Sequence, residues 1–102
     1  MAKTAQEIYA IQERSSFDRS IIPYTLIAAK TRELARSWIE AHIWKYIHDT
    51  WDMWDEIDPS ELDHEPENFG SIVNWEDSVM LKRRKTGEII IIYIDRLYLL
   101  IK

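Results

Sequence analysis

The sequence has no lysine or arginine between Lys45 and Lys82. This middle stretch nevertheless holds eleven of the eighteen acidic residues, namely Asp49, Asp52, Asp55, Glu56, Asp58, Glu61, Asp63, Glu65, Glu67, Glu76 and Asp77. The flanks carry all thirteen basic residues and only seven acidic ones, so the formal charge of -5 sums about -11 in the middle and +6 outside it. Such an asymmetry can steer a partner toward the protein, but it does not identify that partner.

Other absences exclude whole classes of site. With no cysteine there is no disulfide framework, thiolate metal site or cysteine nucleophile, so packing must hold the fold together. Two glycines cannot build a glycine-rich phosphate loop. The longest apolar run, residues 89–94, falls far short of a membrane span of about 18 residues. The N-terminus also lacks the apolar core of a signal peptide. We therefore expect one soluble, intracellular domain over residues 1–102, with no cofactor, no metal and no membrane contact.

The overall composition is typical of proteins that work at high temperature. Isoleucine outnumbers leucine roughly two to one, Asn and Gln are scarce, and charged and aromatic residues are plentiful. In composition and size the whole chain resembles the small orphan proteins of filamentous viruses that infect hyperthermophilic archaea. The resemblance implies a small α+β fold, a location in the host cytoplasm, and a role as regulator, nucleic-acid binder or interaction partner. Because it rests on no motif, it transfers no functional residue.

Two segments have helical signals. Thr4 and Glu7 are spaced as a capping box before a partly apolar stripe, which predicts a short helix near residues 5–15. From Thr31 onward apolar residues recur at helical spacing up to Asp58-Pro59, which predicts one long amphipathic helix. The residues of this second stripe are Ala35, Ile39, Ile43, Ile47 and Trp54. Asp58 and Pro59 then predict one short turn over residues 60–65.

The C-terminal third has the pattern of a β-hairpin. Thr86-Gly87 suits a two-residue turn, and placing Lys85 opposite Glu88 fixes the register. The cross-strand pairs of the expected core face are then Leu81–Ile92, Val79–Ile94, Asp77–Arg96, Trp75–Tyr98 and Val73–Leu100. Because residues 89–94 are apolar on both faces, a helix, a second subunit or a partner should cover the other face.

The patterns together predict an α+β fold in which both helices pack on the C-terminal hairpin. Residues 21–27, which contain Pro23, would add a third edge strand or an extended connector. Internal duplication is an alternative, because Lys30-Thr31-Arg32-Glu33 resembles Lys85-Thr86-Gly87-Glu88 at an offset that also aligns residues 38–40 with 93–95. It predicts two related helix–hairpin motifs.

No residue pattern indicates catalysis. His48 and Asp52 are four residues apart and could share a divalent ion, but a hydrogen bond on a helix surface explains the spacing more simply. The acids from Asp49 to Asp58 repeat about every three residues with no base nearby, which describes a solvated helix face rather than a two-metal site. We expect that the protein is not an enzyme.

Two binding surfaces stand out. The first combines an acidic, Trp-rich segment with the open face of the apolar strand, and it is typical of protein or peptide binding, with self-association as a variant. Its candidate residues are Trp51, Asp52, Met53, Asp55, Ile89, Ile91 and Tyr93. The second is a basic hairpin tip that could grip nucleic acid, made of Lys82, Arg83, Arg84 and Lys85. We favour the first, a viral interaction module for a partner with a basic segment, because the acidic middle would repel a duplex.

Overall fold

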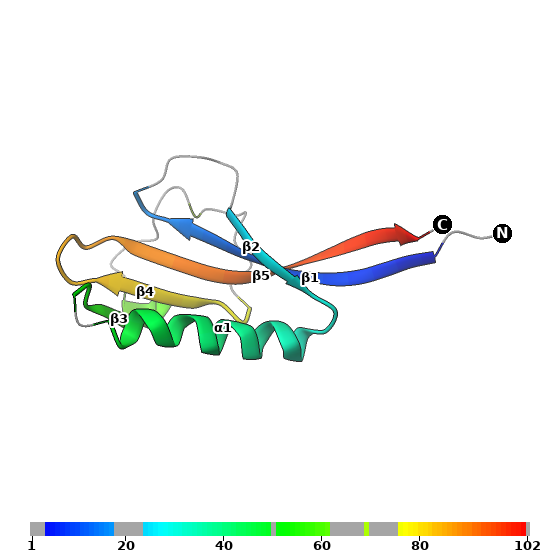
Figure 1. Cartoon of the computed structure of the whole chain (residues 1–102). Coiled ribbons are helices and arrows are strands. Elements are labelled where there is room, and N and C mark those ends of the chain that lie inside the picture. The colour runs from blue at the N-terminus through cyan, green and yellow to red at the C-terminus, as the bar shows by residue number, and fades with distance from the viewer. Residues whose placement is uncertain (1–3, 18–23, 50, 62–68, 70–75, 102) are drawn as a thin grey trace.

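The computed structural model describes residues 4–17, 24–49, 51–61, 69 and 76–101. Their elements, in chain order, are β1 (Thr4–Ser15), β2 (Tyr24–Ala29), α1 (Arg32–Ile47), β3 (Trp54–Ile57), the 3₁₀-helix η1 (Pro59–Glu61), β4 (Val79–Arg83) and β5 (Ile89–Ile101). The strands form one antiparallel sheet in the order β2-β1-β5-β4-β3. Helix α1 lies along one face of this sheet, and β1 and β5 run on together beyond the body as a two-stranded ribbon (Figure 1).

The central strand β5 organises the core. Its residues 90–94 are all buried, because β1 and β4 pair with its two edges and both of its faces are covered. Ile90, Ile92 and Ile94 face α1, in keeping with the two-residue period of a strand. They share this main cluster with Ile11, Ala35, Ile39, Ile43, Trp54 and Leu81.

The second face of the sheet is covered by the chain itself. Phe69 is fully buried there against Met80, Ile91 and Tyr93. Polar side chains from β1 are also buried in the structure, and each has a partner. The Arg14 guanidinium donates to the Tyr93 hydroxyl over 3.4 Å, and Gln12 accepts a hydrogen bond from Thr25 at 2.7 Å. A partner or second subunit is therefore not needed to bury this part of β5.

The predicted N-terminal helix is wrong, because residues 4–15 form β1. All twelve residues pair with β5, from Thr4 opposite Ile101 to Ser15 opposite Ile90. The capping box of Thr4 and Glu7 is a local signal that tertiary structure overrides: a strand as apolar as β5 requires a neighbour on each edge. Glu7 instead pairs with Arg96 of β5 at 3.1 Å.

The predicted long helix is also wrong in length. Helix α1 begins as the pattern indicates, with the Thr31 hydroxyl accepting the Leu34 amide at 3.2 Å, but it ends at Ile47. Asp49 ends the helical pattern, since its carboxylate accepts the amide of Trp51 at 2.8 Å in a local turn. Trp54 is buried as the pattern suggested, but from β3 rather than from a helix.

The C-terminal strands pair in a different register from the predicted one. Leu81 faces Ile90, two residues from its predicted partner, because the Gly87 amide bonds the Arg83 carbonyl at 2.9 Å and widens the turn. A shift of the register by two residues leaves each side chain on its predicted face of the sheet. The pair Asp77–Arg96 does not form, since Asp77 contacts Arg32 and Arg36. The predicted pairs of Val73 and Trp75 lie outside the described residues.

The duplication alternative is wrong as well. Thr31 caps a helix, whereas Thr86 lies in a hairpin turn. Residues 38–40 are helical, and their proposed equivalents 93–95 are in β5. The two four-residue matches thus occupy unrelated local structures.

We expect Phe69 to act as a structural cover. Phe69→Ala should lower the free energy of unfolding by about 3–5 kcal/mol, because it leaves a cavity over Met80, Ile91 and Tyr93. Phe17, which is 61% exposed, provides the control, and Phe17→Ala should cost less than about 0.5 kcal/mol. Urea unfolding followed by circular dichroism measures both. Equal costs for the two variants would contradict the burial of Phe69.

A partly buried carboxyl group should give the fold a pH dependence. Burial raises the pKa of Glu13, and Glu88 raises it further, while a hydrogen bond from Tyr46 lowers it. A carboxyl whose pKa is higher in the folded state stabilises the fold when protonated, and that contribution is lost as the pH rises through the folded pKa. Glu13→Gln should therefore gain stability relative to wild type from pH 4 to 8. Unfolding midpoints at several pH values measure this, and a constant difference would contradict it.

Candidate functional site

The end of α1 and the loop that follows expose a group of large side chains. Trp51 is the most prominent, with 81% of its surface exposed, and Trp44 is 61% exposed. The Trp44 ring lies against His48, with 4.3 Å between the ring centroids. Ile47 and Met53 are also exposed. We refer to Trp44, Ile47, His48, Trp51 and Met53 as the aromatic corner.

The loop that carries Trp51 is anchored on both sides. Asp49 accepts the amides of Trp51 and Asp52, at 2.8 Å and 3.3 Å. After Trp51, the Met53 carbonyl accepts the Arg84 amide at 2.9 Å, which ties the loop to the end of β4. The loop thus holds an almost fully exposed indole on a fixed backbone.

The predicted acidic and basic surfaces meet at this corner. Asp52 pairs with Arg83 at 2.5 Å, and Asp55 receives two hydrogen bonds of 2.7 Å from Arg84. The Arg84 hydrogen bond lowers the pKa of Asp55. The antiparallel pairing of β3 with β4 brings these charges together, since it sets Asp55 opposite Lys82. The acidic segment and the basic hairpin tip, which the sequence presents as alternative binding surfaces, are therefore parts of one surface. Their charges partly neutralise each other.

The basic tip is therefore not an independent cationic surface. The Arg83 guanidinium also lies 5.9 Å from the centre of the Trp54 ring, which holds it against the body. Within the described part of the chain, Lys82 and Lys85 are the members of the cluster that form no ion pair. Two lysines make a weak footprint for nucleic acid, whose affinity depends on the number of phosphates neutralised.

The strand residues predicted to bind a partner are less accessible. Ile91 and Tyr93 are buried under Phe69, and Ile89 is half-buried. A peptide could not add to the β4 side of residues 89–92 either. Strand β4 already fills that edge of β5, from Ile89 to Ile92. Trp51 and Met53 thus remain the exposed members of the predicted set, beside the ion-paired Asp52 and Asp55.

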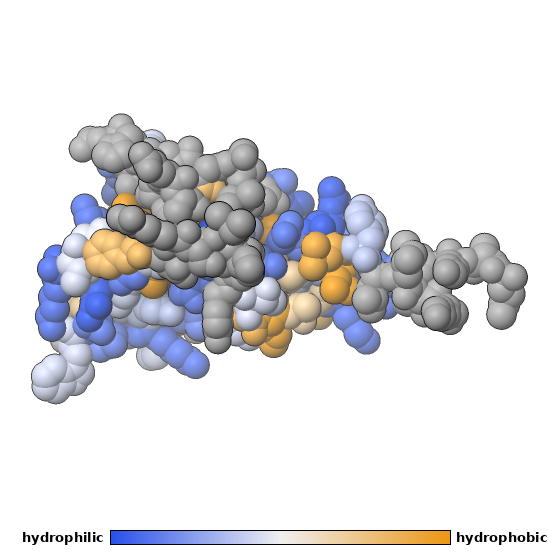
Figure 2. All heavy atoms as spheres, turned by 90° about the horizontal axis from the view of Figure 1, so that it is seen from above, coloured by the Kyte–Doolittle hydropathy of each residue, from blue (hydrophilic) through white to orange (hydrophobic). Residues whose placement is uncertain are grey.

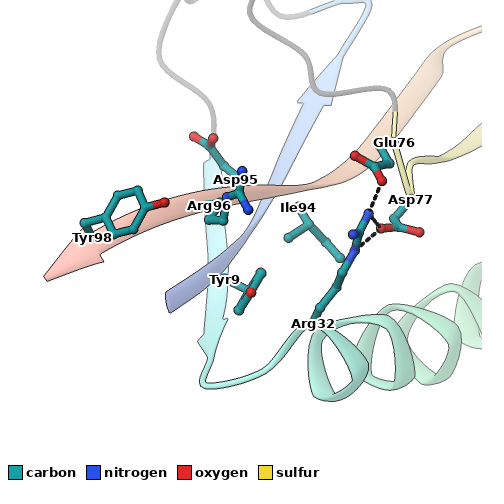
Figure 3. Close-up of a pocket in the computed structure, with 8 residues that line it drawn as sticks. All are labelled: Tyr9, Arg32, Glu76, Asp77, Ile94, Asp95, Arg96 and Tyr98. Carbon is teal, nitrogen blue, oxygen red and sulfur yellow. Dashed lines mark hydrogen bonds and ion pairs between the residues drawn. The ribbon is translucent and has the colours of Figure 1, made fainter. Parts of the chain in front are cut away.

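A second feature, which the sequence did not indicate, is a cleft of about 330 Å³ where β4 stops and β5 continues. Its lining residues are Tyr9, Arg32, Glu76, Asp77, Ile94, Asp95, Arg96 and Tyr98. Figure 3 shows Arg32 reaching from the start of α1 to Glu76 and Asp77 at its wall. These contacts join residues 44 or more positions apart, so no local pattern could reveal them.

The cleft wall is held in an unusual conformation. Asp77 has φ of 60°, in the left-handed region that is uncommon for residues other than glycine. Its carboxylate is bound by Arg32 and, at 3.1 Å, by Arg36. The arginines that face the cleft are thus paired with acids, as Arg96 is with Glu7. Across the residues that the structure describes, no three His, Cys, Asp or Glu side chains gather in a way that could bind a metal.

Comparison with known proteins adds no precedent: no family model, curated protein or solved structure matches the chain. Over the described ranges, no helix has the length and apolar character needed to cross a membrane. The aromatic corner and the cleft are therefore interpreted from their chemistry.

The exposure of Trp51 and the burial of Trp54 predict opposite mutational effects. Trp54 is 8% exposed and packs edge-on against Tyr46, so Trp54→Ala should cost about 3–5 kcal/mol. Trp51→Ala should change stability by less than about 0.5 kcal/mol. Chemical unfolding of both variants measures the contrast. A large loss of stability in Trp51→Ala would show that its indole belongs to the core.

Proposed function

We propose that this protein is a non-catalytic binding module that holds a protein or peptide at the aromatic corner. The observation that carries the proposal is Trp51, a tryptophan that is 81% exposed on an anchored loop. An indole that is exposed to this extent contributes little to the stability of its own fold. Tryptophan and methionine surrounded by charge are enriched at the centres of protein interfaces.

The available energy is sufficient for specific binding. An aromatic side chain can bury about 150–250 Å², and apolar area contributes about 25 cal/mol per Å². Covering Trp44 and Trp51 would thus yield several kcal/mol before the costs of association. The anchored loop lowers one of those costs, because little backbone entropy is lost when hydrogen bonds already hold the backbone that carries the indole.

The charges around the corner favour a partner with a basic segment. Asp52 and Asp55 are occupied by Arg83 and Arg84, so the acids available to a partner are others, such as the exposed Glu56. Nucleic acid is the less favourable ligand, because its phosphates would have to compete with these same carboxylates for the two arginines. The composition supports a viral accessory protein whose partner lies in the host cytoplasm.

The proposal is tested by affinity capture with the tagged chain from host lysate, at low and moderate salt, with and without nuclease. The double variant Trp51→Ser/Met53→Ser should retain less than about one tenth of the captured protein, since loss of a central aromatic residue often costs 2 kcal/mol or more. Leu34→Ser is the matched control, because Leu34 is an exposed apolar residue (58%) at the other end of α1. It should capture as the wild type does.

Two results would count against the aromatic corner. Capture that disappears with nuclease, or with neutralisation of Lys82 and Lys85, would assign the surface to nucleic acid. Equal losses in the double variant and in Leu34→Ser would indicate nonspecific hydrophobic adsorption.

A further inference from the structure

The outer half of β5 has a strand on one side only, as far as the described residues show. Strand β1 pairs with it up to Ile101, whereas β4 pairs only with Ile89–Ile92. From Asp95 onward, the edge that continues the line of β4 carries no strand among the described residues. The cleft lies at the start of this edge, with Ile94, Asp95, Arg96 and Tyr98 in its lining. Figure 3 shows β5 continuing past it.

Two hydrogen bonds show which backbone groups point toward this edge. The Arg83 amide bonds the Glu88 carbonyl on the β4 side, and the Ser16 amide bonds the Ile89 carbonyl on the β1 side. Backbone groups of an antiparallel strand alternate between its two neighbours. The backbone groups of even-numbered residues in β5 therefore point to the β4 side. Arg96 and Tyr98 thus direct their N–H and C=O groups to the open edge.

The C-terminal end of β5 is also apolar in sequence. The sequence from Leu97 to Ile101 contains no charged residue, and Leu97 and Tyr98 are 42% and 66% exposed. Figure 2 shows apolar residues gathered where the ribbon leaves the body. An isolated two-stranded ribbon is marginally stable in water, and a long apolar edge is a template for pairing with another chain.

We propose that this edge binds a second copy of the chain, with β5 pairing antiparallel to β5 across a two-fold axis at Tyr98. The two copies present identical edges, so the contact is self-complementary and closed. Residues that lie directly opposite each other in a sheet have their side chains on the same face. On one strand the residues of one face are all even-numbered or all odd-numbered, so the numbers of two opposite residues must add to an even sum. The two-fold axis therefore passes beside a single residue and not between two.

Charge and space select among these registers. An axis at Arg96 would set the two arginines directly opposite each other, which is unfavourable. With an axis at Leu97, position 102 of the first copy would lie opposite Ile92 of the second copy. Val79, the first residue of β4, already pairs with Ile92 there, so the two chains would compete for the same space directly after Ile101. An axis at Tyr98 moves Val79 two positions farther away. It pairs residues 95–101, sets the two tyrosines opposite each other and places Arg96 diagonal to the second copy's Tyr98.

Self-association is tested first by mass, using sedimentation equilibrium of the full chain from low to high micromolar concentration. Wild type should form a concentration-dependent dimer. Tyr98→Lys opposes two like charges at the axis and should weaken dimerisation at least about tenfold. Tyr98→Phe keeps the ring and should dimerise as wild type does. A monomer at every concentration, or equal association of all three proteins, would overturn the proposal.

The register is tested by cross-linking, which the absence of cysteine makes unambiguous. Any disulfide in a single-cysteine variant must join two copies. Tyr98→Cys places the two cysteines opposite each other, within the Cα separation of about 4.4–6.8 Å that a disulfide spans, and should give a covalent dimer on mild oxidation. Arg96→Cys separates them by about 13 Å along the strands and should not.

Equal cross-linking of both variants, or none at residue 98 in a protein that sediments as a dimer, would overturn this interface. The proposal stands apart from the aromatic corner, which lies at the opposite end of the molecule (Figure 1). The Tyr98→Lys variant separates the two proposals, because it should lose dimerisation and still capture a partner through the aromatic corner.

Discussion

The fold depends on the need to bury the inner half of β5, residues 90–94, on all sides. Residues 90–94 are apolar on both faces, so the strand is stable only with a neighbour on each edge and a cover on each face. Strands β1 and β4 supply the edges, α1 covers one face, and Phe69 covers the other. The N-terminal segment becomes a strand because the alternative would leave a long apolar edge of β5 in water.

The uneven distribution of charge along the chain has a related origin. The acids of the middle stretch pair in space with basic residues of the flanks: Asp52 with Arg83, Asp55 with Arg84, and Asp77 with Arg32 and Arg36. Exposed ion pairs contribute little energy, but opposite charges on adjacent strands favour one register over others. The asymmetry that looked like a device for steering a partner thus serves in part to align β3 with β4 and the start of α1 with the cleft.

The sequence was informative where local physics decides the structure and misleading where distant contacts do. Thr31 marks the helix start, and the alternation over residues 79–94 assigns side chains to faces, because capping and pleating are local. After the end of α1, the Asp49 carboxylate accepts two amides in a local turn, which the run of apolar residues concealed. Trp51 and Met53 could be proposed from composition, whereas the cleft could not, since its ion pairs join separate elements.

The two exposed apolar regions lie at opposite ends of an elongated molecule, 56 Å in its longest dimension. Pairing through the ribbons would therefore leave both aromatic corners uncovered and far apart, at the outer ends of the dimer. Such an arrangement gives no new contact to a small monomeric partner, whose affinity would be the same for one copy or two. A partner with repeated sites would gain, because its second contact would form at a high effective concentration. A dimer with both corners free would thus bind an assembled or repetitive partner more tightly than a single small protein.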